Sequence, residues 1–427
     1  MKVANVAIIG TGYVGLSCGA CLAHLGHRVV CVDNALDKVA LLQTGSIPIL
    51  EPQLSEIVAE GLGAGRLTFT SDLNDSVANA EFVVLCLPTP QGIDGAADMT
   101  YVFDAVSKLK DSLAPGSIVV TKSTVPIGTY GEIVQRLGRT DVEVASNPEF
   151  VREGSAVADF LHPDRIIIGA RTDAVAQRVA TLYKDIDAPV VVTDPASAEM
   201  LKYAANAFLA LKLTYINSIA AICDAYGADI QDVVRGLSFD PRIGGQFFNP
   251  GPGWGGSCFP KDTRALTHIS EQGGYDFRLL KTAIEANDLH QQSIVDKTIS
   301  SCDGDVRGKV IAVWGLTFKA NTDDIRDSPA IVVVKKLLEL GARMQCFDPT
   351  VSKVPTEIEG SLLAETALEA TTGASALILL TEWAEFASVK PGDVFERMSS
   401  PRVVDARNLL DRESWQENGF TYRGVGR

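Results

Sequence analysis

Short, apolar, β-branched runs alternate with helical stretches through the first part of the chain, and this alternation constrains the fold more than any other feature. Strands that alternate with helices predict βαβ units and a parallel sheet. Turn, hydroxyl and acidic residues closely follow the runs, and ligands bind beyond the carboxyl ends of such strands. The predicted strands are Val6–Ile9, Val29–Val32, Phe82–Leu87, Ser117–Thr121, Val142–Ala145 and Arg165–Ile168.

A long helix and a second α/β lobe are expected next. Residues 196–226 contain no Gly or Pro and repeat apolar residues at helical spacing, which predicts a helix connecting two lobes. Residues 236–264 are crowded with Gly and Pro and predict a loop, and helical texture returns from about 261 to 300. The later elements are strands ending at Gly315 and Asp348, strands over Ala376–Leu380 and Arg402–Val404, and a helix over Ala330–Leu340.

Composition excludes several classes of function. The chain has 427 residues, which suits two or three domains, and a net charge of −15 without a basic block argues against nucleic-acid binding. No apolar run approaches the roughly 18 residues of a membrane span, so no membrane partner is expected. Eight scattered cysteines favour reduced thiols in the cytoplasm, and five histidines form no ligand-like cluster, so no metal is expected.

The turn Gly10–Gly15 reads G-x-G-x-x-G, follows the first strand and opens a helix. Its glycines permit a tight turn, close approach to a pyrophosphate and close packing of helix on sheet. Asp33 ends the second strand, where a carboxylate can bind both ribose hydroxyls and repel a 2′-phosphate, which favours NAD over NADP. The alternatives are a glycine turn that binds no nucleotide and an Asp33 that serves only its turn.

Cys258 ends a loop rich in glycine, and Lys261 and Asp262 open the helix that follows. A helix N-terminus and a nearby cation lower the pKa of a thiol, so Cys258 is a candidate nucleophile. Asp262 can hold a water or orient Lys261. The alternative is a buried structural cysteine beside a tight turn.

Lys202 and Asn206 lie four residues apart on the predicted long helix and therefore share a face. A lysine and an asparagine in this arrangement can stabilise an oxyanion or hold a water. The alternative is a solvated polar stripe that also includes Glu199.

Two segments that follow strands carry further candidate groups. Residues 147–154 place Glu149 and Glu153 four apart, which suits general acid–base chemistry or, alternatively, ordinary turn and cap contacts. Residues 122–126 place Ser123 and Thr124 where their hydroxyls can line a nicotinamide pocket, or alternatively cap a helix.

With these motifs the chain resembles the UDP-glucose/GDP-mannose dehydrogenase family, and within it the UDP-glucose 6-dehydrogenases. The resemblance covers most of the chain, in order. The matching pieces are GTGYVG at 10–15, KSTVP at 122–126, NPEF and REG within 147–154, HPDRI at 162–166, KYAANAFLALK at 202–212, PRIG at 241–244, GGSCFPKD at 255–262 and GLTFKANTDDIRDSP at 315–329.

The resemblance implies an α/β fold of two Rossmann-like, doubly wound domains joined by a long central helix. Residues 1–195 would form an NAD-binding Rossmann-like domain. Residues 196–300 would form a central helical dimerisation region with the catalytic cysteine loop, and residues 301–427 a UDP-sugar-binding Rossmann-like domain. The expected assembly is a homodimer.

The family's chemistry implies twofold oxidation of UDP-glucose at C6 to UDP-glucuronate, with NAD as the cofactor. Cys258 would carry a thiohemiacetal and then a thioester, which water hydrolyses. Lys202 would stabilise oxyanions, Asn206 and Asp262 would place water or relay protons, and Glu149 would assist as acid–base with Thr124.

The resemblance also implies the residues that bind the two ligands. The expected NAD contacts are Gly10, Gly12, Tyr13, Val14, Gly15, Asp33, Lys38, Thr89, Thr124, Glu153, Lys261 and Arg326. The expected contacts of the sugar nucleotide are Phe150, Val151, Arg152, Glu153, Lys202, Asn206, Arg242, Phe247, Phe248, Asn249, Pro250, Gly251, Gly255, Lys319 and Arg407.

Three alternatives stay open at this stage. The same chemistry could act on GDP-mannose or UDP-N-acetylmannosamine, although the residues Phe259–Asp262 and Pro241–Gly244 favour UDP-glucose. A single-step hydroxyacid dehydrogenase would not need Cys258. An NAD-binding sensor without activity would leave Cys258, Lys202 and Glu149 without a purpose.

Overall fold

The computed structural model describes residues 3–427, so the first two residues of the predicted domain 1–195 lie outside it. The chain divides into two compact units. The first unit contains the residues up to Ala205 together with Arg264–Tyr275. The second unit contains Asn206–Thr263 and Asp276–Arg427.

The first unit is built on an eight-stranded sheet in the order β3-β2-β1-β4-β5-β6-β7-β8. Its first six strands have the order of a doubly wound dinucleotide-binding fold. All neighbouring strands are parallel except β6 and β7, which pair antiparallel. The strands are β1 (Asn5–Ile9), β2 (Arg28–Val32), β3 (Leu67–Thr70), β4 (Phe82–Leu85), β5 (Ile118–Thr121), β6 (Glu143–Ser146), β7 (Ile166–Ala170) and β8 (Val190–Thr193).

Helices cover both faces of this sheet, because successive side chains of a strand point to opposite sides. Val6 and Ile8 of β1 belong to one apolar core, and Ala7 and Ile9 belong to the other. The first core includes α1 (Tyr13–His24), α2 (Leu36–Gln43), α3 (Leu54–Gly63), α7 (Ala156–Leu161) and α8 (Asp173–Ala180). The second core includes α4 (Leu73–Val77), α5 (Thr100–Leu109) and α6 (Thr129–Leu137).

The second unit repeats the same topology in a fully parallel sheet of six strands, ordered β11-β10-β9-β12-β13-β14. Trp314 at the end of β9 is buried, and its ring stacks on Phe386 at a centroid distance of 5.2 Å. The strands are β9 (Val310–Trp314), β10 (Arg343–Phe347), β11 (Leu362–Leu363), β12 (Ala376–Leu379), β13 (Arg402–Asp405) and β14 (Thr421–Arg423).

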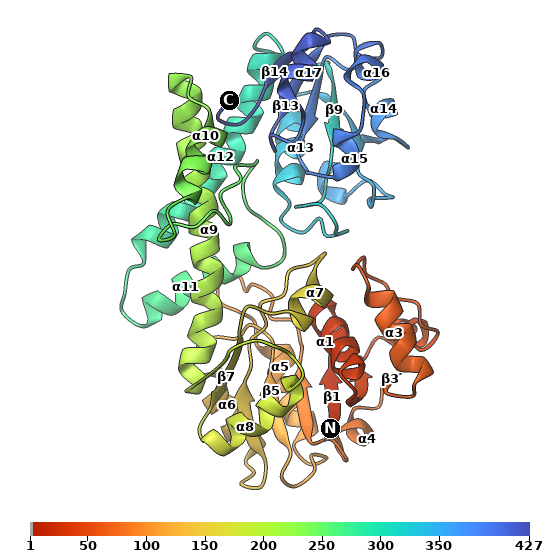
Figure 1. Ribbon diagram of the computed structural model, residues 1–427, viewed down its shortest axis with the longest axis vertical. Helices are drawn as coiled ribbons and strands as arrows, with labels where there is room; N and C mark the ends of the chain where they lie inside the picture. Colours follow the sequence, from red (N-terminus) through yellow and green to blue (C-terminus); the bar gives the residue numbers. More distant parts are fainter. Residues whose placement is uncertain (1–2) are drawn as a thin grey trace. The chain divides into compact units, whose positions relative to one another are not determined.

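The helices of the second unit also form two layers. One core joins residues of α9 (Pro195–Tyr226), α10 (Ile230–Ser238), α12 (Arg278–Ser301) and α13 (Pro329–Glu339) to the sheet. The other joins α14 (Ala367–Ala370), α15 (Ala384–Ala387), α16 (Pro391–Phe395) and α17 (Arg412–Glu417) to the opposite face. The predicted α/β fold, with two Rossmann-like domains and a long connecting helix, is confirmed (Figure 1).

Helix α9 spans 32 residues, as the uninterrupted helical pattern predicts. By length and composition alone it could cross a membrane, with a mean hydropathy of 1.3 over its most apolar window. However, Glu199, Lys202 and Asn206 are buried in the protein, and Ile216 and Ala220 pack in the core of the second unit. These contacts fit the core helix of a soluble protein.

The helical texture expected from about 261 to 300 corresponds to two helices in the structure. Helix α11 (Phe259–Gln272) ends before Gly273 and Gly274, and α12 begins at Arg278. Gly274 adopts a φ of +77°. Glycine takes this left-handed conformation readily, and helices commonly end with it.

Candidate active site

The glycines of the turn after β1 have two different roles. Gly10 and Gly15 allow close packing, and Gly12 borders open space. A Cβ on Gly10 would lie 2.5 Å from the carbonyl oxygen of Cys86, and one on Gly15 would lie 1.9 Å from that of Gly10. A Cβ on Gly12 would meet nothing within 4 Å. The first N–H groups of α1 receive no side-chain cap. The turn therefore leaves open space in front of an uncapped helix N-terminus, which suits a phosphate.

Asp33 stands at the end of β2 and organises this turn. Its Oδ2 accepts hydrogen bonds from the backbone N–H and hydroxyl of Thr11, at 3.0 and 2.6 Å, and its Oδ1 accepts from the N–H of Ala35. Lys38 pairs with it at 2.9 Å. Burial acts to raise the pKa of Asp33, but these hydrogen bonds prevail and lower it to about 2. Asp33 is therefore a carboxylate at neutral pH, as ribose binding requires.

The second unit contains a similar turn with a more deeply buried aspartate. Thr317 donates its N–H and hydroxyl to Asp348 at 3.1 Å, as Thr11 does to Asp33. Asp348 also accepts the indole N–H of Trp383 and is buried. A Cβ on Gly315 would lie 2.3 Å from Thr381, just as one on Gly10 would lie 2.5 Å from Cys86. The glycine after the first strand therefore serves close packing in both units.

Tyr13 in the first turn of α1 links the glycine turn to the segment that carries Glu149. Its hydroxyl contacts Glu51, and both groups accept the N–H of Gly154. Glu51 lies in the segment between α2 and α3, and the sequence analysis did not identify it as a site residue.

Lys202 and Glu149 form a buried ion pair in the first unit. The Lys202 Nζ lies 3.0 Å from Glu149 Oε1, and both side chains are less than 10% exposed, at 5% and 8%. Glu149 Oε2 accepts the N–H of Val151 at 2.7 Å, so it also makes the turn contact that was its alternative role. Lys202 lies 5.3 Å from the ring centroid of Phe150. The proposed solvated stripe on α9 is wrong, because Glu199, Lys202 and Asn206 are all buried.

Thr124 lines a small cavity together with Lys202. The Thr89 hydroxyl donates to the Thr124 carbonyl at 2.8 Å, which places both predicted threonines together after β4 and β5. Ser123 plays a structural part, since its hydroxyl bonds the backbone of Leu87.

Cys258 immediately precedes α11 in the second unit. It is partly exposed, whereas the other seven cysteines of the chain are buried. Its loop is held against the second unit by glycines: a Cβ on Gly255 would lie 2.0 Å from the Asp327 carbonyl oxygen, and one on Gly256 would lie 2.8 Å from the Phe318 ring. The buried structural role that was the alternative for Cys258 therefore does not describe it.

Asp262 lies in the first turn of α11 and is buried. Its Oδ2 accepts the amide of Asn206 at 2.6 Å, and its Oδ1 pairs with Lys261 at 2.5 Å. Its N–H donates to the Cys258 carbonyl at 2.9 Å. The carboxylate thus connects α9 to the segment that carries the thiol.

Several predicted substrate residues meet in the second unit. The Gly251 N–H donates to Asn217 at 3.0 Å, and the Gly251 carbonyl bonds His290 at 2.7 Å. Arg407 lies against Gly251, and its guanidinium donates to the Phe318 carbonyl at 2.8 Å. Asn217 and His290 are buried polar groups that sequence reasoning missed.

Two lysines of the second unit lie close to aromatic rings. Lys212 lies 4.3 Å from the ring centroid of Phe248, and Lys319 lies 5.5 Å from that of Phe318. Phe247 adopts a φ of +63° and packs its ring against Phe259, immediately after Cys258.

Three predicted arginines form ion pairs with aspartates nearby in the sequence. Arg242 pairs with Asp240, Arg326 with Asp324 and Arg152 with Asp159, at 2.6, 2.7 and 2.6 Å. The Arg242 side chain is 87% exposed.

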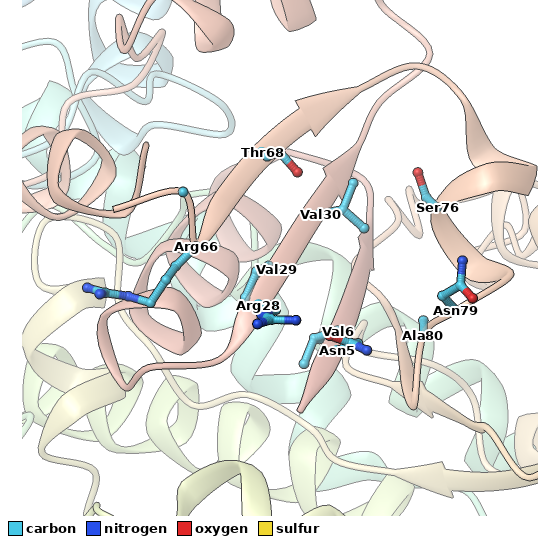
Figure 2. Close-up of a pocket in the computed structure, with 11 residues that line it drawn as sticks. Asn5, Val6, Arg28, Val29, Val30, Arg66, Thr68, Ser76, Asn79 and Ala80 are labelled. Carbon is cyan, nitrogen blue, oxygen red and sulfur yellow. The ribbon is translucent and has the colours of Figure 1, made fainter. Parts of the chain in front are cut away.

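One hollow of the first unit lies at the opposite ends of the strands from the glycine turn. It measures about 240 Å³ and is lined by residues such as Asn5, Arg28 and Thr68 at the starts of β1, β2 and β3 (Figure 2). Ligands of open parallel sheets bind at the carboxyl ends of the strands, so this hollow is not the expected site.

Similarity to known proteins extends over 99% of the chain. Residues 4–187, 196–289 and 312–412 match the NAD binding, central and UDP binding domains of the UDP-glucose/GDP-mannose dehydrogenase family. The chain belongs to this family. It is 45% identical to a UDP-glucose 6-dehydrogenase of Rhizobium meliloti (strain 1021), with 99% of each chain covered.

Solved structures of the family agree with this fold. A UDP-glucose dehydrogenase from Pyrobaculum islandicum is 34% identical with a TM-score of 0.91, and 100% of this chain and 98% of that chain are covered. A UDP-D-ManNAc dehydrogenase from Pyrococcus horikoshii is 26% identical with a TM-score of 0.88, and 99% of each chain is covered.

As a member of this family, the chain is an NAD-dependent oxidoreductase. The first unit fits the cofactor, because Gly12 leaves space before the N-terminus of α1 and Asp33 is ionised beside it. The described residues 3–427 include no cluster of three or more His, Cys, Asp or Glu that could hold a metal ion.

The different surroundings of Gly12 and Gly15 give a paired prediction. Gly15→Ala should lower the thermal unfolding temperature, because its Cβ would lie 1.9 Å from the Gly10 oxygen. Gly12→Ala should leave the unfolding temperature of the ligand-free enzyme unchanged and weaken NAD binding roughly tenfold or more, since the methyl group would enter the phosphate space. Thermal unfolding and fluorescence titration with NAD measure the two effects. Unaltered NAD affinity in Gly12→Ala would show that the pyrophosphate lies elsewhere.

Proposed function

We propose that this enzyme oxidises UDP-glucose at C6 to UDP-glucuronate in two steps, with Cys258 as the covalent nucleophile. One observation carries the proposal: of eight cysteines, the one at the start of α11 is partly exposed, and it adjoins a buried carboxylate with asparagine and lysine partners. Relatives named UDP-glucose 6-dehydrogenase that match 99% of the chain support the choice of substrate.

In the first oxidation, the C6 hydroxyl loses a proton and C6 loses a hydride, which leaves an aldehyde. NAD, when bound, supplies the hydride acceptor for each of the two oxidations. Lys202 stabilises the alkoxide that forms as the hydroxyl proton leaves. Glu149, paired with Lys202 at 3.0 Å, accepts that proton through a water that Thr124 helps to hold.

The aldehyde is then captured by Cys258. The thiolate adds to C6 and forms a thiohemiacetal, whose oxygen takes up a proton. Loss of that proton and of a second hydride from C6 gives a thioester. A water held by Asp262 and Asn206 adds to the thioester carbonyl, the C–S bond breaks, and the acid and the thiol are released. The overall reaction consumes one water and two NAD for each sugar.

The ligand contacts are assigned on the same basis. Gly10–Gly15, Asp33, Lys38, Thr89, Thr124, Glu153, Lys261 and Arg326 are proposed to hold NAD. Residues Phe150–Glu153, Lys202, Asn206, Arg242, Phe247–Gly251, Gly255, Lys319 and Arg407 are proposed to hold the sugar nucleotide. Arg407 and Lys319 can neutralise the diphosphate, since each lies beside Phe318 in the second unit.

The domain division and assembly are part of the proposal. Residues 1–195 form the NAD-binding domain, 196–300 the central dimerisation region and 301–427 the UDP-sugar domain. Dimerisation through α9 is supported by four exposed side chains that recur at heptad-like spacing, namely Phe208, Tyr215, Ile222 and Tyr226. A location in the cytoplasm is supported by eight free cysteines.

The substrate and the number of oxidations are tested by stoichiometry. With limiting UDP-glucose and excess NAD, absorbance at the NADH band should show two NADH formed for each sugar consumed. A ratio of one would contradict the twofold oxidation and favour a single-step dehydrogenase. Parallel assays with GDP-mannose and UDP-N-acetylmannosamine should show much lower kcat/KM, and a higher value with either would change the assigned substrate.

The role of Cys258 is tested by Cys258→Ser. The variant should bind UDP-glucose as the wild type does, because only sulfur is replaced, and should form acid slower by on the order of 10³-fold or more. Isothermal titration and single-turnover assays separate the two effects. In the wild type, iodoacetamide should label Cys258 alone, since the other cysteines are buried. Full turnover by the variant would mean that the nucleophile is another group.

The dimer contact is tested by Phe208→Asp combined with Tyr215→Asp. Two carboxylates on the exposed face of α9 should convert the dimer to a monomer in sedimentation velocity, because burying them would cost more than the contact provides. Phe239→Asp is the control, since Phe239 is 83% exposed and lies after α10. A double variant that sediments as the wild type does would place the contact on another surface.

A further inference from the structure

Glu199 lies three residues before Lys202 on α9, and its carboxylate is buried in the first unit. Its Oε2 accepts the N–H of Gly128 at 2.7 Å, and its Oε1 accepts the N–H of Tyr130 at 2.8 Å. These N–H groups belong to the N-terminus of α6 (Thr129–Leu137), where a negative charge is favourable. Both oxygens are therefore anchored to a rigid element.

A cavity of about 10 Å³ lies between Glu199 and Lys202. This volume is about that needed for one water molecule, provided that polar groups surround it. Thr121 and Ser146, at the ends of β5 and β6, line the cavity. The Ser146 hydroxyl interacts with Glu199, whereas the Thr121 hydroxyl is buried without a hydrogen-bond partner. Buried hydroxyls without partners are rare in folded proteins.

We propose that the cavity holds one ordered water, which joins the Thr121 hydroxyl to Glu199 and Lys202, and that Glu199 is a positioning residue for Lys202. The inference rests on the proposed function in one respect, the role of Lys202 as the cation that stabilises the alkoxide. Glu199 does not touch the substrate. It acts by holding the ammonium group in place through the water.

The arrangement gives Lys202 two carboxylates with different tasks. Glu149 contacts it directly at 3.0 Å and must exchange protons during turnover. Glu199 is fixed by α6 and acts across the water. When Glu149 becomes protonated, Glu199 still favours the charged form of Lys202, because opposite charges stabilise each other strongly in a buried site. The ammonium thus stays charged throughout the reaction.

The charge of Glu199 depends on pH near neutrality. Burial raises the pKa of Glu199 to about 6, although hydrogen bonds from Gly128, Tyr130 and Ser146 oppose the rise, and Asp194 adds to it. Asp194 is its charged neighbour, Lys202 lines the same cavity, and Glu149 contacts Lys202. Above pH 6 Glu199 is ionised and supports Lys202, and below pH 6 it takes up a proton and this support is lost.

The test is the pH dependence of kcat for NADH formation in wild type and Glu199→Gln. The wild type should show an acid limb near pH 6 and an alkaline limb set by deprotonation of Lys202. In Glu199→Gln the acid limb should disappear and the alkaline limb should move to lower pH by about 0.5–1 unit, with KM for UDP-glucose changed less than twofold. A uniform loss of kcat with both limbs unmoved would reduce Glu199 to a structural role and overturn the proposal.

A second variant covers the case in which Glu199→Gln does not fold. Thr121→Val keeps the shape of the side chain and removes one partner of the water, so it should move the alkaline limb in the same direction by a smaller amount. Ser117→Ala is the control, because the Ser117 hydroxyl is also buried without a partner but does not line this cavity. Equal profiles for Thr121→Val and Ser117→Ala would contradict the proposal.

A crystal structure at high resolution examines the water directly. Density for a water within hydrogen-bonding distance of Thr121 Oγ1 is expected in the wild type, and its absence would overturn the proposal. The NADH stoichiometry of the wild type separates this inference from the proposed function. Two NADH per sugar with unmoved pH limbs would refute the part given to Glu199 alone, whereas one NADH per sugar would refute the proposed function.

Discussion

The Lys202 ammonium lies buried 3.0 Å from the Glu149 carboxylate, and removing one partner of a buried ion pair is strongly destabilising. This pair ties two distant segments of the sequence together. Glu149 stands in the loop after β6, and Lys202 stands on α9, so α9 must pack where that loop reaches it. Glu51, Tyr13 and Gly154 then connect the same loop to the glycine turn. The position of the loop after β6 relative to the glycine turn of the first unit therefore depends on this ion pair.

The two units show how one topology serves two purposes. Each has a glycine turn after its first strand and an aspartate after its second, and in each a threonine donates its N–H and hydroxyl to that aspartate. Asp33 remains near the surface with Lys38, whereas Asp348 is buried beneath Trp383. The two turns therefore share one hydrogen-bond pattern and differ in how deeply the aspartate is buried.

The strands that cross the middle of each sheet could be predicted from the sequence, because β-branched residues buried on both faces leave a continuous apolar run. Edge strands could not. In β8 the valines at 190–192 are exposed, and β11 has only two residues. The antiparallel pairing of β6 and β7 also left no local signal, because direction depends on how the chain returns to the sheet. Cys258, Lys202 and Asp33 stood out because each is a chemically distinctive residue beside a turn or within an apolar run. Glu199 did not stand out in the sequence. Its helix is apolar around most of its circumference, so the spacing of residues alone does not show which polar side chains are buried.

A net charge of −15 would by itself repel a phosphorylated substrate, and the local charges of the site counteract this repulsion. Both buried carboxylates that are proposed to act on the sugar have a lysine within 3.0 Å, Glu149 with Lys202 and Asp262 with Lys261. Each pair is neutral, so neither adds to the repulsion of a diphosphate. Lys212 and Lys319 then provide the second unit with cations beside its aromatic rings, whereas Arg407 is paired with Glu382 at 2.9 Å. Since charges separated by more than about 10 Å are largely screened at 0.1 M salt, these nearby groups outweigh the acidic surface for a bound nucleotide sugar.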